Sequence, residues 1–166
     1  MELSASLRTA ASVDQVLSHV CELDRYTQWM PLVHNAVPEP GSEPAAWSVE
    51  LRARVGPFAR SKRLRMVRTV MDAGVSAPRA TAQSHARIVF ERRELDGRSH
   101  AQWRLEVVVA SATTASASAA TGEMNPTTEL TMHLSYDGRF FASVVESILQ
   151  QQIDEGRRRL SALLAG

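Results

Sequence analysis

Apolar and polar residues alternate strictly along much of this chain, and the alternation predicts β-strands. In residues 47–55 every odd-numbered position is apolar and every even-numbered one is polar. This two-residue period is that of a strand with one buried face. Similar alternation, or a short apolar run bounded by turn residues, predicts further strands over 2–9, 32–37, 58–71, 80–91, 101–109 and 129–136.

Two short helices are expected between the first two strands. Val13, at the start of an apolar stripe over 13–20, follows Ser12, and Gln15 stands three residues after that serine. This spacing is typical of a capping box, in which the two side chains satisfy each other's backbone N–H groups. A second helical piece over 23–30 should end before Pro31, because proline disfavours helical geometry in the residue that precedes it.

One long amphipathic helix is predicted over 137–164, with Asp137 as its N-cap. Its apolar stripe is expected to contain Phe141, Val145, Ile148, Leu149, Gln152, Ile153, Gly156, Leu160 and Leu163. Two members of that stripe are unusual. Gln152 brings an amide, and Gly156 lowers helix stability by roughly 1 kcal/mol relative to alanine. Gly156 indicates a close approach to a strand, a tolerated irregularity of the helix, or a helix side that faces a space.

The order of these elements predicts an α+β domain. Successive strands joined by short turns favour an antiparallel sheet of about six to seven strands. One helix covers such a sheet only if the sheet curls around it, which leaves a large core or a cavity. Residues 110–127 have low complexity and no periodicity, and they are expected to form a mobile loop within a single domain spanning 1–166.

Composition narrows the classes of function. The formal net charge is +1, which disfavours a nucleic-acid partner. The basic run over 60–68 fits a solvated strand face or a local anionic contact site. A single cysteine, Cys21, excludes an intrachain disulfide and is consistent with a cytoplasmic location. No apolar run is long enough to span a membrane, and no secretory signal is expected. An open sheet edge would allow a homodimer.

Residues 21–33 read C-E-L-D-R-Y-T-Q-W-M-P-L-V and carry a resemblance to a known family. Asp24, Tyr26, Trp29 and Pro31 match a pattern of Asp, Tyr, Trp and Pro before a strand in the START, birch-pollen-allergen and polyketide-cyclase superfamily (SRPBCC). The closing strand and long helix are similar too, and the polyketide cyclase/dehydrase and coenzyme-Q-binding-like group is the nearest in character. The resemblance implies a helix-grip fold: a curved antiparallel sheet around a long C-terminal helix, with two short helices after the first strand. It also implies an apolar cavity for a hydrophobic small molecule.

Catalytic and metal chemistry finds little support on the face expected to be buried. His85, His100 and His133 all fall at polar positions, and no cysteine or histidine pair has metal-ligand spacing, so neither a metal site nor a cofactor is expected. Arg68 has the same parity as its apolar neighbours. A buried arginine needs a partner, so Arg68 should lie at a pocket mouth, be paired, or be turned outward by a bulge.

The expected ligand-binding set combines the inward-facing residues of the strands with one side of the last helix. Its members are Trp29, Trp47, Leu51, Leu64, Met66, Arg68, Ser84, Ile88, Trp103, Leu134, Tyr136, Phe141, Val145, Ile148 and Gln152. The three tryptophans fit either core packing or a flat ligand.

Three functions remain open from the sequence. The first is binding, transport or sequestration of a lipid, quinone or polyketide. The second is an aromatase/cyclase-type enzyme, for which Arg68 and Tyr136 are the candidate catalytic groups. The third is a partner-binding domain with a filled cavity.

Overall fold

A computed structural model describes residues 1–55, 58–76, 83–113, 126–138 and 142–166. Its strands are β1 (Glu2–Thr9), β2 (Val33–Pro38), β3 (Ala46–Val55), β4 (Phe58–Ser76), β5 (Gln83–Arg92), β6 (Trp103–Thr113) and β7 (Pro126–Tyr136). Its helices are α1 (Val13–Val20), the 3-10 helix η1 (Leu23–Gln28) and α2 (Ala142–Ala165).

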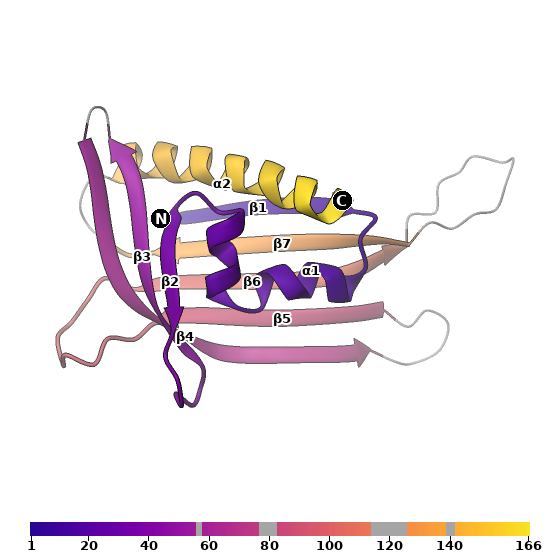
Figure 1. Ribbon diagram of the computed structural model, residues 1–166, viewed down its shortest axis with the longest axis horizontal. Coiled ribbons are helices and arrows are strands. Elements are labelled where there is room, and N and C mark those ends of the chain that lie inside the picture. The colour runs from indigo at the N-terminus through magenta and orange to yellow at the C-terminus, as the bar shows by residue number, and fades with distance from the viewer. Residues whose placement is uncertain (56–57, 77–82, 114–125, 139–141) are drawn as a thin grey trace, which may run out of the picture.

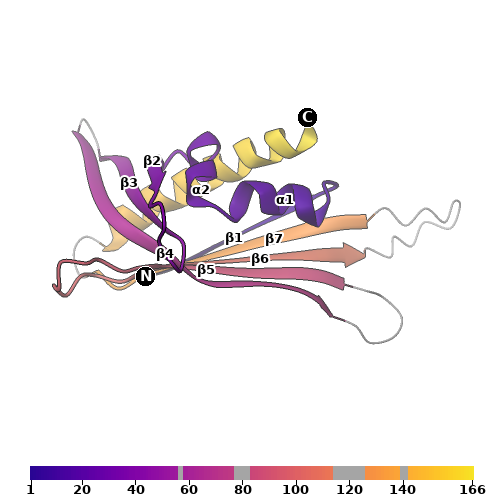
Figure 2. The ribbon, with the colours of Figure 1, turned by 60° about the horizontal axis from the view of Figure 1, so that its bottom comes forward.

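The strands form one antiparallel sheet in the order β1-β7-β6-β5-β4-β3-β2. The pairs Leu3–Leu134 and Leu105–Leu134 place inward-facing residues of three strands side by side. All helices lie on one side of this sheet, toward which β2, β3 and part of β4 curl (Figures 1 and 2). The α+β helix-grip architecture expected from the sequence is therefore confirmed.

Strand β4 is longer than predicted and changes face partway along. Its pairing with β5 shifts between Arg68 and Val70. Such a bulge moves the following side chains to the opposite face. Val70 pairs with Val89, and Val89 pairs with Glu106 on β6. Because paired residues share a face, Val70 lies with Glu106 on the convex face of the sheet. Unbroken alternation over the predicted strand 58–71 would place Val70 on the inward face with Leu64. That expectation is wrong, because alternation does not reveal the extra residue at a bulge.

The capping box predicted at the first helix is present. Ser12 Oγ accepts a hydrogen bond from the Gln15 backbone N–H at 3.2 Å, and Gln15 Oε1 accepts from the Ser12 N–H at 2.8 Å. The prediction of Asp137 as an N-cap was wrong, because α2 runs over Ala142–Ala165. The Asp137 carboxylate instead accepts a hydrogen bond from the Gln102 N–H at 2.5 Å, which holds Asp137 against the start of β6.

Helix α2 buries part of the predicted apolar stripe. Leu149, Ile153 and Leu160 are its buried apolar residues among those described, whereas Leu163 is 44% exposed. A Cβ added to Gly156 would lie 3.0 Å from Met30 Sδ and 3.5 Å from the Trp29 carbonyl oxygen. Gly156 thus marks a close approach to the chain after η1. The alternatives of a close approach to a strand and of open space beside Gly156 were both wrong.

The prediction of a loop over 110–127 was wrong at both ends of that range. Strand β6 continues to Thr113 and β7 begins at Pro126, so both ends of that range are strand. Residues 114–125 lie outside the described part of the chain. Among the described residues, no helix is long and apolar enough to cross a membrane.

Candidate functional site

The concave face of the sheet encloses a small apolar cavity of about 90 Å³. It lies between the sheet, the segment around η1 and helix α2. Its lining residues are Leu3, Ala5, Leu23, Tyr26, Met30, Leu32, Val33, Val49, Leu51, Leu64, Met66, Trp103, Leu105, Met132, Leu134 and Ile153. A second gap of about 20 Å³ adjoins it and shares Ala5, Met30, Met132 and Ile153 with it. These four side chains therefore divide one larger apolar space.

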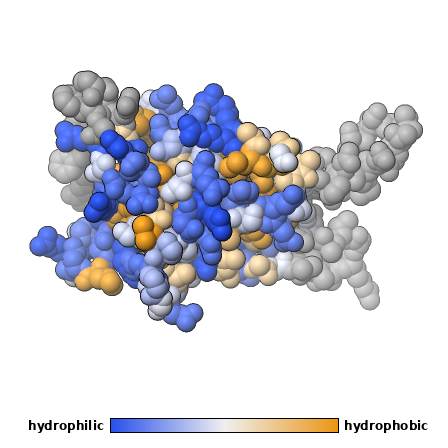
Figure 3. All heavy atoms as spheres, viewed as in Figure 1, coloured by the Kyte–Doolittle hydropathy of each residue, from blue (hydrophilic) through white to orange (hydrophobic). Residues whose placement is uncertain are grey.

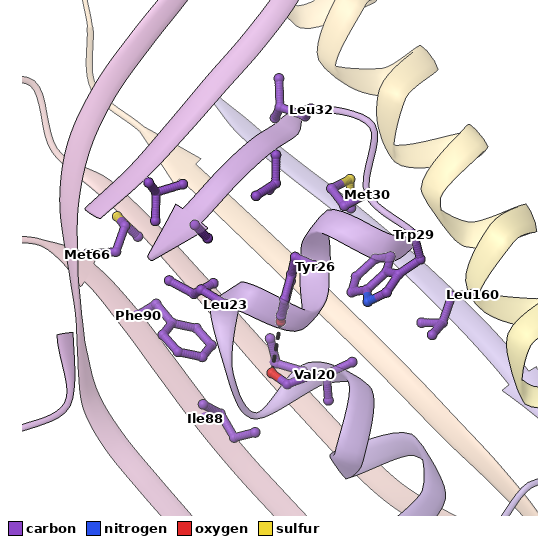
Figure 4. Packing of buried hydrophobic residues seen from close by; sticks show 14 of the residues in the cluster. Val20, Leu23, Tyr26, Trp29, Met30, Leu32, Met66, Ile88, Phe90 and Leu160 are labelled. Atoms are coloured by element: carbon purple, nitrogen blue, oxygen red, sulfur yellow. Dashed lines mark hydrogen bonds between the residues drawn. The ribbon is translucent and has the colours of Figure 1, made fainter. Parts of the chain in front are cut away.

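Two hydrogen bonds fix the segment that closes the cavity. The Tyr26 hydroxyl donates to the Val20 carbonyl at 3.0 Å, and Trp29 Nε1 donates to the His19 carbonyl at 3.2 Å. The rings of Tyr26 and Trp29 pack with their centroids 4.6 Å apart. Both bonds dock η1 onto the C-terminal end of α1, which carries the segment over the sheet (Figure 4).

The Asp24 carboxylate ties the same segment to the sheet, because it accepts a hydrogen bond from Trp47 Nε1 at 2.9 Å. Trp47 lies on β3 and packs edge-on against Phe90 of β5. Asp24, Tyr26 and Trp29, which carry the sequence resemblance, are thus structural anchors of the cavity wall.

Burial keeps the Tyr26 hydroxyl protonated at neutral pH, so it does not serve as an acid–base group. The side chain is 1% exposed, and this burial raises the pKa of its hydroxyl far above the usual range, because the phenolate would be poorly solvated. Burial also raises the pKa of the Cys21 thiol, with a smaller contribution from nearby Glu22. Tyr26 is the one lining residue with an ionisable side chain, so these described walls offer no proton-transfer group at neutral pH.

The structure brings together some of the predicted ligand-binding residues. Five of them line the cavity: Leu51, Leu64, Met66, Trp103 and Leu134. Trp47 and Ile88 are buried in the surrounding core, and Trp29 lines the smaller gap. Tyr136 does not line the cavity but packs against Trp103, which does, with ring centroids 4.6 Å apart.

The ligand-binding residues predicted on the last helix either lie apart from the cavity or fall outside the residues that the structure describes. Ile148 is half-buried and does not line the cavity. Gln152 lines a separate polar cleft with Pro31, His34, Arg52 and Ala53. The side chains of Ser84 and Val145, and the whole of Phe141, lie outside the described residues.

Arg68 points inward and is paired. Its Nη1 donates to the Cys21 carbonyl at 2.9 Å, and its guanidinium lies 5.6 Å from the centre of the Trp47 ring. The bulge follows Arg68 and does not turn this side chain outward. Of the three alternatives open from the sequence, the arrangement fits the paired arginine, and Arg68 does not line the cavity.

Several lining residues were not singled out from the sequence. Leu3, Ala5, Leu105 and Met132 follow directly from strand parity, which was the available signal. Leu23, Met30, Leu32 and Val33 belong to the segment from η1 to β2, and no local pattern shows that this segment closes over the sheet. Among the described residues, no three His, Cys, Asp or Glu side chains are grouped to hold a metal ion.

Comparisons by sequence give no match, either to a protein-family model or to a curated protein. Comparisons by structure do. The chain is similar to XoxI from Bacillus cereus, at 8% identity and a TM-score of 0.58, with 99% of this chain and 95% of that chain covered.

Two further solved structures share the fold. A START superfamily protein from Mycobacterium smegmatis matches at 11% identity and a TM-score of 0.54, with coverage of 99% and 97%. The di-domain aromatase/cyclase BexL of the BE-7585A biosynthetic pathway matches at 13% identity and a TM-score of 0.53. That match covers 98% of this chain but 49% of BexL, so the chain spans about half of that protein. These likenesses confirm the START-like, SRPBCC resemblance at the level of the fold.

Proposed function

We propose that this START-like chain binds a hydrophobic small molecule in the space between the sheet, the η1 segment and α2. The proposal rests on the apolar character of the cavity wall. Its residues are apolar except for the Tyr26 hydroxyl, which already donates to Val20, and the Trp103 N–H. Binding sites for small molecules are typically apolar with a few polar groups.

The cavity has to expand before it holds a ligand the size of a lipid or quinone. Its volume of about 90 Å³ is well below the ~300–1,000 Å³ of typical ligand pockets. Met30, Met66 and Met132 all belong to the wall, and methionine side chains adapt their shape readily. Movement of Met30, Met132 or Ile153 would join the cavity to the gap of about 20 Å³ beside it.

Helix α2 is the element best placed to admit a ligand. Ile153 is its single contribution to the cavity wall among the described residues. Its described surface carries ion pairs such as Arg158–Glu155 and Arg159–Glu155. Hydrophilic and hydrophobic residues lie side by side on the face of the molecule seen in Figure 3. A helix held by few wall contacts opens at lower cost than the hydrogen-bonded sheet.

The direct test is native mass spectrometry of the freshly purified chain, followed by titration with an apolar fluorophore. Ala5→Leu adds a larger side chain at a position shared by both spaces, and it should weaken binding at least tenfold. Ser4→Leu is the matched control, because Ser4 is exposed on the opposite face of the same strand. Equal affinities for the two variants, or no binding by the parent chain, would refute the proposal.

A cyclase remains the alternative function. It requires a proton-transfer group beside the ligand, and the described cavity wall offers none at neutral pH. Turnover of a poly-β-keto substrate by the parent chain, lost in Tyr136→Phe, would favour the enzyme.

A further inference from the structure

One end of the cavity carries a donor without an acceptor. Trp103 lines the cavity and is 8% exposed, and its Nε1 has no hydrogen-bond partner among the described residues. Trp29 Nε1 and Trp47 Nε1, in contrast, donate to the His19 carbonyl and the Asp24 carboxylate. A buried N–H without a partner is costly and calls for an explanation.

A cation lies over the same indole. Lys62 Nζ is 5.8 Å from the centre of the Trp103 ring and 5.5 Å from that of Tyr136, both within the range of a cation–π contact. Lys62 pairs with Leu51 across β3 and β4. Directly paired residues share a face, so Lys62 stands on the concave side of the sheet, beside the cavity-lining Leu51.

The charge of Lys62 is not neutralised by an ion pair within the described residues. The nearby Glu94 carboxylate already has two other donors. It accepts a hydrogen bond from Arg92 Nε at 2.6 Å and one from the Arg65 backbone N–H at 3.3 Å. Burial lowers the pKa of Lys62, the Arg92 charge lowers it further, and Glu94 opposes them. The two cations and one carboxylate leave a surplus positive charge.

Building on the proposed function, we infer that this end anchors the head of an amphiphilic ligand. The ligand class is an apolar chain or ring that ends in an anionic oxygen, above all a carboxylate. Its head would pair with Lys62 and accept a hydrogen bond from Trp103 Nε1, while its body fills the apolar space toward Met30. Trp103 Nε1 is closed off in the unliganded chain, so seating the head requires the surrounding side chains to move apart.

The experiment compares acids with their uncharged esters on the full chain. The probes are decanoic acid with methyl decanoate, and 2-naphthoic acid with methyl 2-naphthoate, each titrated calorimetrically. Each acid should bind about tenfold more tightly than its ester, because charge-assisted hydrogen bonds contribute ~1.5–3 kcal/mol. The acid that binds more tightly then shows whether the body is a chain or a ring.

Substitutions locate the head. Lys62→Met should weaken binding of the acid about tenfold and leave the ester unchanged, and Lys62→Arg should retain most of the preference. Arg63→Met is the matched control, because Arg63 is the next residue along β4 and its side chain is 81% exposed. Equal effects of Lys62→Met and Arg63→Met would mean a general charge effect and would overturn the inference.

The three indole N–H resonances give an independent readout. In a nitrogen–proton correlation spectrum, assigned with Trp103→Phe, the Trp103 signal should move downfield when the acid is added and move little with the ester. The signals of Trp29 and Trp47, which already have acceptors, should move less. If acid and ester bind equally and the Trp103 signal stays in place, the head-group inference fails while the proposed function stands. If neither binds, both fail.

Discussion

Replacement of Gly156 by alanine tests how α2 packs against the cavity wall. The added Cβ would lie 3.0 Å from Met30 Sδ, 3.1 Å from Met30 Cε and 3.5 Å from the Trp29 carbonyl oxygen. The last is an ordinary contact. The first two require the tip of Met30 to retreat by roughly 0.5 Å to reach a normal separation.

The magnitude follows from two opposing effects. Alanine stabilises a helix interior by about 1 kcal/mol relative to glycine. A small displacement of the Met30 tip from its preferred rotamer costs about 0.5 kcal/mol, and the cavity that Met30 lines gives the side chain somewhere to go. We therefore expect Gly156→Ala to raise the free energy of unfolding by about 0.5 kcal/mol, which corresponds to roughly 1–2 °C in Tm.

The assay is urea unfolding followed by circular dichroism, with calorimetry for Tm. Met30→Ala provides the control background, since Gly156→Ala should there gain the full ~1 kcal/mol of helix propensity. Gly156→Leu should instead destabilise the parent by about 1–3 kcal/mol, because the larger side chain also meets the Trp29 backbone. The packing argument is wrong if Gly156→Ala destabilises the chain by 1 kcal/mol or more, or if Gly156→Leu is tolerated.

Two further predictions concern the anchors of the η1 segment. Tyr26→Phe removes the hydrogen bond to Val20 and should lower the free energy of unfolding by about 1 kcal/mol at neutral pH. Because burial raises the Tyr26 pKa in the folded chain, the unfolded chain loses this proton first, near pH 10, and stability should fall as pH rises above that value. Urea unfolding between about pH 9 and 11 should show a smaller loss in Tyr26→Phe; equal losses would contradict the assignment. Trp47→Phe removes the donor to Asp24 and should cost about 1.5–3 kcal/mol, with Asp24→Asn costing less because its amide oxygen still accepts; urea unfolding that gives the reverse order would contradict this.

The sequence predicted the sheet well because alternation is a local property. The inward parity of β1, β3, β6 and β7 follows directly from the residue pattern, as does the capping box at Ser12. The inward face predicted for β4 is wrong only after Arg68, where one extra residue in the strand reverses the parity. Lys62 has the parity of Leu64 and Met66, so its position on the concave face was readable, although its contact with Trp103 was not.

The cavity was decided by tertiary structure. Its volume is what remains after the η1 segment and α2 have docked, and no local pattern encodes the space left between surfaces that are distant in sequence. The pairing of Arg68 with Cys21 and the approach of Gly156 to Met30 arise in the same way. So does the Trp103 N–H, which has no acceptor within the described part of the chain. The periodicity of the sequence indicates which side chains are buried. Packing alone determines which of these side chains come into contact and where a space remains between them.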